Sequence, residues 1–216
     1  MTLNKLTPTF KLFLFCVALV FTRMLKTHQL SYLFLFWNLF LAFLPLWFIN
    51  RANNSTNQYI KWVLVGLSLL FLPNAPYVLT DLFHLHKSKV VPMWYDLILI
   101  VSFALLSLIY FVQATHFIFG TIKLHVKPYL TEPIKFLVFM SCGYGIYLGR
   151  YLRFNSWDLI TDPLILANGI INSLFNNNAY KETYAITFVF GIFLYLLFEL
   201  FSVMRKNTIN ETFYNQ

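Results

Sequence analysis

Long apolar runs, each close to the length of a membrane-spanning helix, occupy most of this chain. A helix needs ~20 apolar residues to cross the hydrocarbon core of a bilayer. Six runs qualify, at about residues 6–22, 30–49, 59–79, 96–119, 134–150 and 183–204. Inside a bilayer the backbone must be hydrogen-bonded internally, so such runs fold as helices. We therefore predict an all-α polytopic membrane protein with about six transmembrane helices in one integral membrane domain, residues 1–216.

Composition supports this class and argues against others. Of the 216 residues 59% are hydrophobic and only 11% are charged, whereas a soluble domain carries about 25% charged residues. The net charge of +8 comes from basic residues scattered at the ends of the apolar runs, where they can reach anionic lipid headgroups. This distribution favours membrane lipid rather than nucleic acid as a partner. Cys16 and Cys142 lie inside apolar runs and are expected to be buried packing residues rather than a disulfide.

The segment between the fifth and sixth runs contains a further short helix signal. Asp162 and Pro163 suit a helix start, because aspartate caps free N–H groups and proline fits the first turn. The run to Phe175 would place Leu164, Ala167, Ile171 and Leu174 on one face. It is too short to span a bilayer, so we expect a short amphipathic helix that lies at the membrane interface or dips back into the membrane.

Orientation is predicted from the basic residues. With six crossings, nine Lys and Arg residues fall on one side and seven on the other. The positive-inside rule then favours a multi-pass protein of the cell membrane with both termini in the cytoplasm. Independently of orientation, the loops at 80–95 and 150–182 would emerge on the same side, and five of the eight acidic residues gather there.

The third run is interrupted by two prolines. Pro73 and Pro76 cannot donate to the carbonyl groups of Leu69 and Leu72, and a residue that precedes a proline is pushed toward extended geometry. Asn74, between the prolines, has an amide that can satisfy a freed backbone group. This pattern indicates either a cavity lined by unwound backbone or a simple proline kink.

Titratable residues follow this break at once. Asp81 and His84 are three positions apart and would share a helical face, as an acid–base pair requires. The alternative is that Thr80 or Asp81 caps a short helix running from Leu82 to about Lys89. Asp96 is likewise expected to cap the next span. The spacing of Asp81, His84 and His86 matches no metal signature, so neither a metal nor a cofactor is predicted.

Arg150 and Arg153 end the fifth run. Guanidinium groups suit phosphate or carboxylate ligands, so the pair favours anion binding or an ion pair with Asp81 or Asp158. Basic residues are also favourable at any helix C-terminus. Gly145 and Gly149, four positions apart, permit close approach of another helix.

The segments 71–85 and 145–158, with Trp94-Tyr95-Asp96 between them, resemble a family of bacterial membrane proteins called domain of unknown function 1361. The resemblance extends from about Asn38 to the last run and implies a multi-spanning membrane protein without a settled activity. It marks the following positions: Asn74, Pro76, Tyr77, Thr80, Asp81, His84, Trp94, Tyr95, Asp96, Gly149, Arg150, Arg153, Asn155, Trp157 and Asp158.

Together these observations predict a polar pocket on one side of the membrane domain. It would bind an anionic lipid or polyprenyl-phosphate headgroup, with Asp81 and His84 as a catalytic pair. The predicted ligand-binding residues are Asn74, Tyr77, Arg150, Arg153, Asn155 and Asp158. Two alternatives are a small-solute or ion transporter that uses the proline-broken third helix, and a non-catalytic accessory subunit whose charged residues only hold loops together.

Overall fold

A computed structural model describes residues 7–85, 90–175 and 180–214. These residues form helices and no strand. In chain order the elements are α1 (Pro8–Thr27), α2 (Phe34–Asn53), α3 (Gln58–Phe71), α4 (Asn74–Tyr77), the 3-10 helix η2 (Val78–His84), α5 (Met93–Lys123), the 3-10 helix η3 (Pro128–Leu130), α6 (Thr131–Arg150), α7 (Asp158–Thr161), α8 (Pro163–Phe175) and α9 (Tyr180–Tyr214).

The all-α class predicted from the sequence is confirmed. Five helical segments are long and apolar enough to cross a membrane: α1, α2, the stretch Gln58–Phe83, α5, and residues 181–205 of α9. The fifth predicted span is α6, which is not among them. Lys135 near its start, Arg150 at its end and three glycines between them lower its hydropathy. That α6 crosses the membrane, which would make six spans, therefore stays a prediction, as does the interfacial position of α8.

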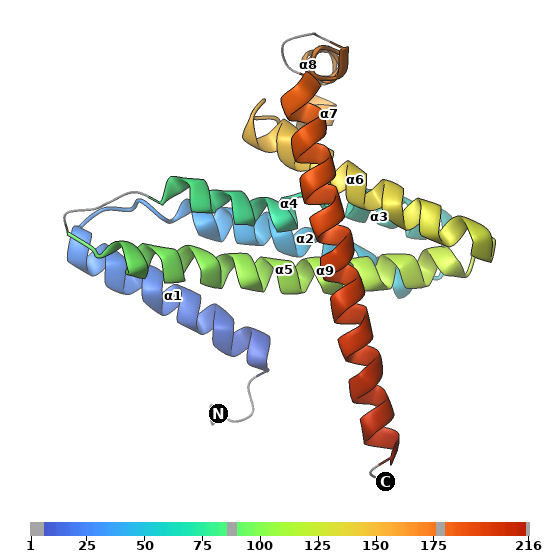
Figure 1. The fold of residues 1–216 in the computed structure, drawn as a ribbon, viewed down its shortest axis with the longest axis horizontal. Coiled ribbons are helices and arrows are strands. Elements are labelled where there is room, and N and C mark those ends of the chain that lie inside the picture. The colour runs from blue at the N-terminus through green and yellow to red at the C-terminus, as the bar shows by residue number, and fades with distance from the viewer. Residues whose placement is uncertain (1–6, 86–89, 176–179, 215–216) are drawn as a thin grey trace.

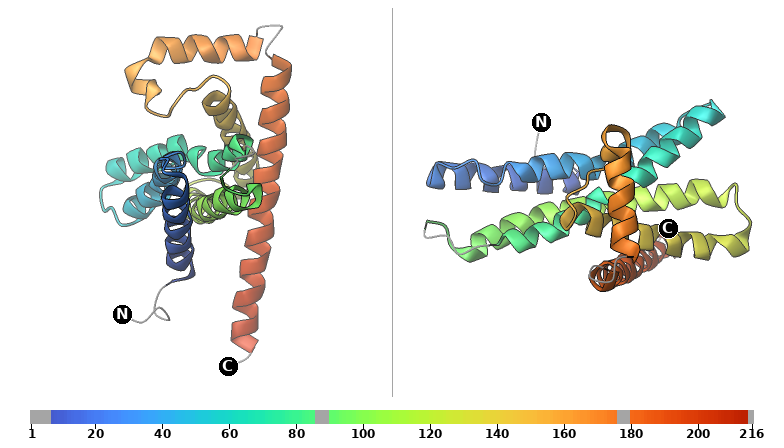
Figure 2. Two further views of the ribbon diagram at one scale, coloured as in Figure 1. Left: turned by 90° about the vertical axis from the view of Figure 1, so that its left-hand side faces the viewer. Right: turned by 90° about the horizontal axis from the view of Figure 1, so that it is seen from above.

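The helices do not all run side by side. In Figure 1 α1, α2, α3 and α5 extend along the length of the molecule, and α9 crosses them steeply. Seen from above in Figure 2, α9 is viewed almost end-on, whereas α5 lies in the plane of the picture. α6 packs against α9, and α2 packs against both α3 and α5. The last predicted span is thus a helix laid across the others.

Two glycines allow α6 and α9 to approach closely. A Cβ atom on Gly143 would lie 2.8 Å from the backbone nitrogen of Gly191 and would also clash with the Thr187 carbonyl oxygen. A Cβ atom on Gly191 would in turn meet the Met140 side chain. Farther along the same contact, Lys135 on α6 lies 3.6 Å from Glu199 on α9. Small residues and one ion pair therefore hold the crossing helix in place.

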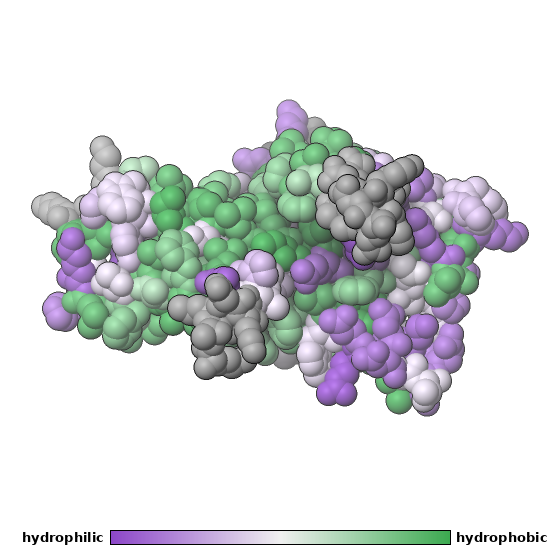
Figure 3. All heavy atoms as spheres, turned by 90° about the horizontal axis from the view of Figure 1, so that it is seen from below, coloured by the Kyte–Doolittle hydropathy of each residue, from purple (hydrophilic) through white to green (hydrophobic). Residues whose placement is uncertain are grey.

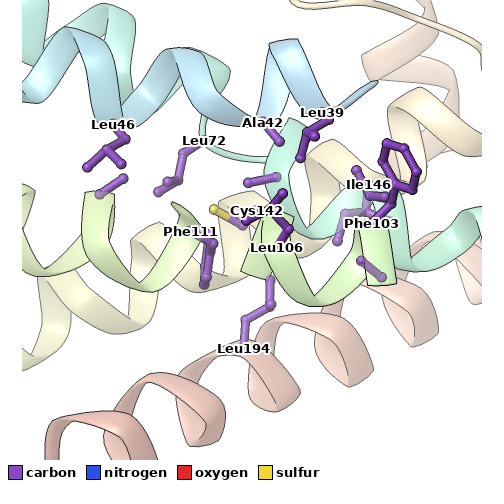
Figure 4. Packing of buried hydrophobic residues seen from close by; sticks show 14 of the residues in the cluster. Leu39, Ala42, Leu46, Leu72, Phe103, Leu106, Phe111, Cys142, Ile146 and Leu194 are labelled. Atoms are coloured by element: carbon purple, nitrogen blue, oxygen red, sulfur yellow. The ribbon is translucent and has the colours of Figure 1, made fainter. Parts of the chain in front are cut away.

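The apolar core lies between α2, α5 and α6, with α9 against its outer side (Figure 4). α5 contributes Phe103, Leu106 and Phe111, all fully buried. Leu39 and Ala42 of α2 face them in the same cluster. Cys16 and Cys142 are both buried and unpaired, as the sequence predicts for packing residues.

The outer surface is largely apolar, as a helical membrane protein requires. Figure 3 shows a broad hydrophobic area on the face seen from below, with hydrophilic residues gathered mainly to one side. On α8, Leu164, Ile165 and Phe175 are exposed, whereas Ser173 is buried. Leu164, Ala167 and Ile171 of the predicted apolar face are exposed and point away from the rest of the molecule.

Candidate ligand-binding site

The segment around the two prolines, residues 72–76 (the proline break), keeps helical backbone angles, which corrects one prediction. Leu72, directly before Pro73, has φ −55° and ψ −39°, so it is not extended, and Ala75 lies inside α4. The Leu69 carbonyl accepts from the Leu72 N–H at 3.3 Å, and the Leu72 carbonyl accepts from the Ala75 N–H at 3.2 Å. Shorter i+3 hydrogen bonds thus replace the i+4 bonds that the prolines remove.

Side chains supply further partners for the break. Asn74 Nδ2 donates to the Phe71 carbonyl at 3.0 Å, as predicted for an amide at this position, and to Ser156 Oγ at 2.9 Å. Ser156 Oγ donates to the Leu70 carbonyl at 3.4 Å. On the other side, the Ser107 hydroxyl of α5 donates to the Ala75 carbonyl. The break is therefore linked both to the loop after α6 and to α5.

The glycines of α6 bring it directly against the break. A Cβ atom on Gly145 would lie 2.7 Å from the Pro73 ring, and one on Gly149 would lie 3.0 Å from the Tyr77 ring. The close approach predicted for these two glycines is confirmed, and the partner is the proline-broken segment.

A cavity of about 440 Å³ lies beside this contact, between α2, the break, α6 and α8. Its walls are mostly aliphatic and aromatic, and none of the described residues lining it is an acid, a lysine, an arginine or a histidine. Its polar side chains belong to Asn38, Ser141, Asn155 and Ser156, together with Asn74, Tyr77 and Tyr144. Three of the predicted site residues, Asn74, Tyr77 and Asn155, therefore line one space.

Asp81 lies behind this space rather than in it. It is 1% exposed, its Oδ2 atom accepts from Asn38 Nδ2 at 2.8 Å, and its Oδ1 atom lies 3.9 Å from Arg150 Nη1. Arg150 also stands over the Phe83 ring at 5.3 Å. The broken segment and the end of α6 thus meet, and Arg150 pairs with Asp81 rather than with Asp158.

The capping role considered for Thr80 or Asp81 is wrong. Both residues lie within η2, which already begins at Val78 and has no side-chain cap. Thr80 donates to the Tyr77 carbonyl at 2.7 Å instead. The part of the predicted helix beyond Leu85, together with His86 and the His84 side chain, falls outside what the structure describes.

Arg153 and Asp158 stand apart from the Asp81 cluster. Arg153 is exposed, with a left-handed φ of 61°, directly before the cavity-lining residues Phe154 and Asn155. Asp158 accepts from the Asn155 backbone N–H at 2.7 Å and so fixes the turn that starts α7. Arg153 therefore adjoins the cavity, and Asp158 shapes the loop that closes one side of it.

A second buried ion pair, between Arg23 and Asp96, was not predicted from the sequence. Arg23 at the end of α1 donates to both carboxylate oxygens of Asp96, at 2.7 and 3.1 Å. The Tyr32 hydroxyl also donates to Asp96, at 3.3 Å. Burial and the adjacent Asp96 carboxylate raise the pKa of the Tyr32 phenol. The helix-cap role predicted for Asp96 is wrong, because its carboxylate is engaged by Arg23.

These features define a multi-pass helical membrane protein with a largely apolar cavity beside a proline-broken helix. The family described as proteins of unknown function, DUF1361, matches residues 37–197, and the chain belongs to this family. No curated protein and no solved structure matches the chain.

Proposed function

We propose that the protein binds an amphipathic membrane lipid in the cavity beside the proline break. The observation that carries the proposal is the composition of the wall, which is apolar over most of its area and has amide and hydroxyl groups on one part. Ligand sites commonly combine an apolar lining with a few convergent polar groups. An acyl or prenyl chain would lie along the leucines, with the headgroup toward Asn155.

An anionic headgroup has a candidate partner in Arg153. This residue is exposed and directly precedes the lining residues Phe154 and Asn155. Arg150, in contrast, already stands 3.9 Å from the buried Asp81. We therefore assign phosphate contact to Arg153, while Arg150 and Asp81 hold the wall of the cavity together.

The test is lipid binding by the purified full-length protein. Native mass spectrometry should detect a co-purified lipid, and phosphatidylglycerol added after delipidation should bind again. Arg153→Ala should weaken phosphatidylglycerol binding about tenfold, which corresponds to one charge-assisted hydrogen bond. Lys127→Ala is the control, because Lys127 is an exposed basic residue beyond the other end of α6. If no lipid binds the delipidated wild type, the proposal is wrong.

The Asp81–Arg150 pair also supports the alternative of an accessory subunit without a ligand. In that case the charges would only join η2 to α6. The double variant Asp81→Arg with Arg150→Asp would then regain thermal stability lost in each single variant and retain the cellular phenotype. Loss of lipid binding in the stable double variant would favour the lipid-binding proposal instead.

Three further expectations stay proposals. The acid–base role of Asp81 and His84 would require Asp81 to reach a ligand, although its carboxylate is held by Asn38. Transport would require access from both faces, which cysteine labelling along the third apolar segment can measure. Location in the cell membrane with both termini cytoplasmic still depends on the distribution of basic residues.

A further inference from the structure

The polar groups that line the cavity differ in which of their donor and acceptor atoms remain available to a ligand. Asn74 uses both amide hydrogens, on the Phe71 carbonyl and on Ser156 Oγ. Its remaining hydrogen-bonding group is the acceptor oxygen Oδ1. The Ser156 hydrogen is also in use, on the Leu70 carbonyl. This part of the wall therefore presents acceptors rather than donors.

The next groups along the wall add donors as well as acceptors. Asn38 uses one amide hydrogen on Asp81 Oδ2, and its Oδ1 atom bonds to none of the residues that the structure describes. Tyr144 donates to Ser173 Oγ, because the Ser173 hydrogen goes to the Ile170 carbonyl. The Tyr77 phenol contacts the cavity and has no hydrogen bond within the described part of the chain. Two amide oxygens and the phenol are thus available, together with donors: the second amide hydrogen of Asn38, the Asn155 side-chain amide and the Ser141 hydroxyl.

These groups exclude some chemistries from the interior. A phosphate inside the cavity would lack a counter-charge, because none of the described lining residues is a lysine, an arginine or a histidine. A buried ammonium group would lack a counter-charge, since none of the lining residues that the structure describes is acidic and Asp81 is already held by Asn38 and Arg150. Uncharged O–H groups both donate and accept, so they match this mixture of donors and acceptors.

We propose that the cavity recognises a lipid through an uncharged polyol, either the terminal glycerol of a phospholipid or the sugar of a glycolipid. This inference rests on the proposed lipid-binding function. The polyol would donate to Asn38 Oδ1 and Asn74 Oδ1 and exchange hydrogen bonds with the Tyr77 phenol. Any phosphate would lie at the opening near Arg153, from where both the polyol and an acyl chain would enter the cavity.

The inference is tested with three lipids of identical acyl chains: phosphatidylglycerol, phosphatidic acid and monoglucosyl diacylglycerol. Affinities for the delipidated full-length protein are measured by native mass spectrometry. Phosphatidylglycerol, the glucosyl lipid or both should bind at least about tenfold more tightly than phosphatidic acid, because the latter has no polyol. The better of the two polyol lipids identifies the source of the group.

Tyr77→Phe is the matching variant, since it keeps the ring that packs on Gly149 and removes only the hydroxyl. It should reduce the preference for the polyol lipids about threefold to fivefold, whereas Tyr151→Phe should not. Tyr151 is an exposed tyrosine directly after α6 and does not line the cavity. Equal effects of the two variants would overturn the inference.

The two proposals fail in different ways. Phosphatidic acid binding as tightly as both polyol lipids would overturn the polyol inference and leave lipid binding intact. Binding of none of the three lipids would overturn both.

Discussion

Arg23 and Asp96 form a buried ion pair between α1 and α5. Their side chains are 8% and 2% exposed and lie 2.7 Å apart. Each is costly to leave in a low-dielectric interior without the other. The guanidinium also lies 4.2 Å from the centre of the Tyr32 ring. The pair therefore ties the first helix to α5 through groups that cannot be removed singly.

We expect either single substitution, Arg23→Met or Asp96→Leu, to destabilise the protein by about 3–5 kcal/mol, because the remaining charge stays buried. The double variant should lose much less, since no charge is left unpaired. Thermal unfolding in detergent, analysed as a double-mutant cycle, measures the difference. Additive losses would contradict the interpretation of this pair as mutually dependent.

The sequence predicted some of these residue contacts and missed others for identifiable reasons. Asn74 was assigned to a freed backbone group because the need is local, and it does donate to the Phe71 carbonyl. Asp96 was assigned a local cap, but its partner Arg23 lies 73 positions away. An aspartate near a helix start can always be interpreted as a cap, so the local sequence does not indicate the distant ion pair with Arg23.

At the scale of elements, glycine positions decide which helices touch. Gly143 contacts the α9 backbone, whereas Gly66 and Gly120 have no neighbouring atom within 4 Å of an added Cβ. Backbone atoms cannot rotate away as side chains can. The same residue type therefore has opposite consequences on different helices.

Gly143→Ala should destabilise the protein by about 1–3 kcal/mol, because α9 must move away from α6 to admit the methyl group. Gly66→Ala and Gly120→Ala serve as controls and should be neutral or stabilising by up to about 1 kcal/mol. Melting temperatures of the three variants measure this. A Gly143→Ala protein as stable as the controls would exclude the close α6–α9 contact.

The break between α3 and α4 yields a second prediction at this scale. Ser156→Ala leaves Asn74 Nδ2 and the Leu70 carbonyl without this hydroxyl and should cost about 1–3 kcal/mol. Ser55→Ala is the control, because Ser55 bonds only within its own exposed loop. Urea or detergent unfolding of both variants gives the comparison. Equal stability would mean that the loop after α6 does not support the break.

The sequence predicts approximately where helices lie along the chain but not how they are oriented relative to one another. Five of the predicted spans each overlap one helix, whereas the third, 59–79, covers α3, α4 and the start of η2. α1 continues past the predicted end at residue 22 to Thr27. The additional residues of α1 include Arg23, which bonds to Asp96. The sequence around residue 22 gives no sign of this distant contact. The steep crossing of α9 also depends on packing with α6, and a hydropathy pattern carries no information on crossing angle.

The whole molecule combines a layer of lengthwise helices with a long crossing helix. α5 has 31 residues and α9 has 35, so at 1.5 Å per residue they extend about 47 and 53 Å. Both exceed the ~30 Å hydrocarbon core of a bilayer. Because they cross steeply (Figure 1), at least one of them must be strongly tilted in a flat membrane.

The number of crossings can be measured with single cysteines in a variant whose Cys16 and Cys142 are replaced by alanine. If α6 crosses the membrane as predicted, a cysteine at Lys127 and one at Asn155 should react with an impermeant maleimide from opposite sides. Both positions are exposed. Labelling of both from the same side would mean that α6 does not span the bilayer.

The contact between Ser156 and the proline break has a consequence for how the chain is made. Ser156 lies 86 positions after Leu70, whose carbonyl it helps to satisfy. At about 5–20 residues per second of synthesis, the ribosome adds that hydroxyl roughly 4–17 s after the break itself. During this interval the nascent third segment must remain inserted with one of its anchors still untranslated.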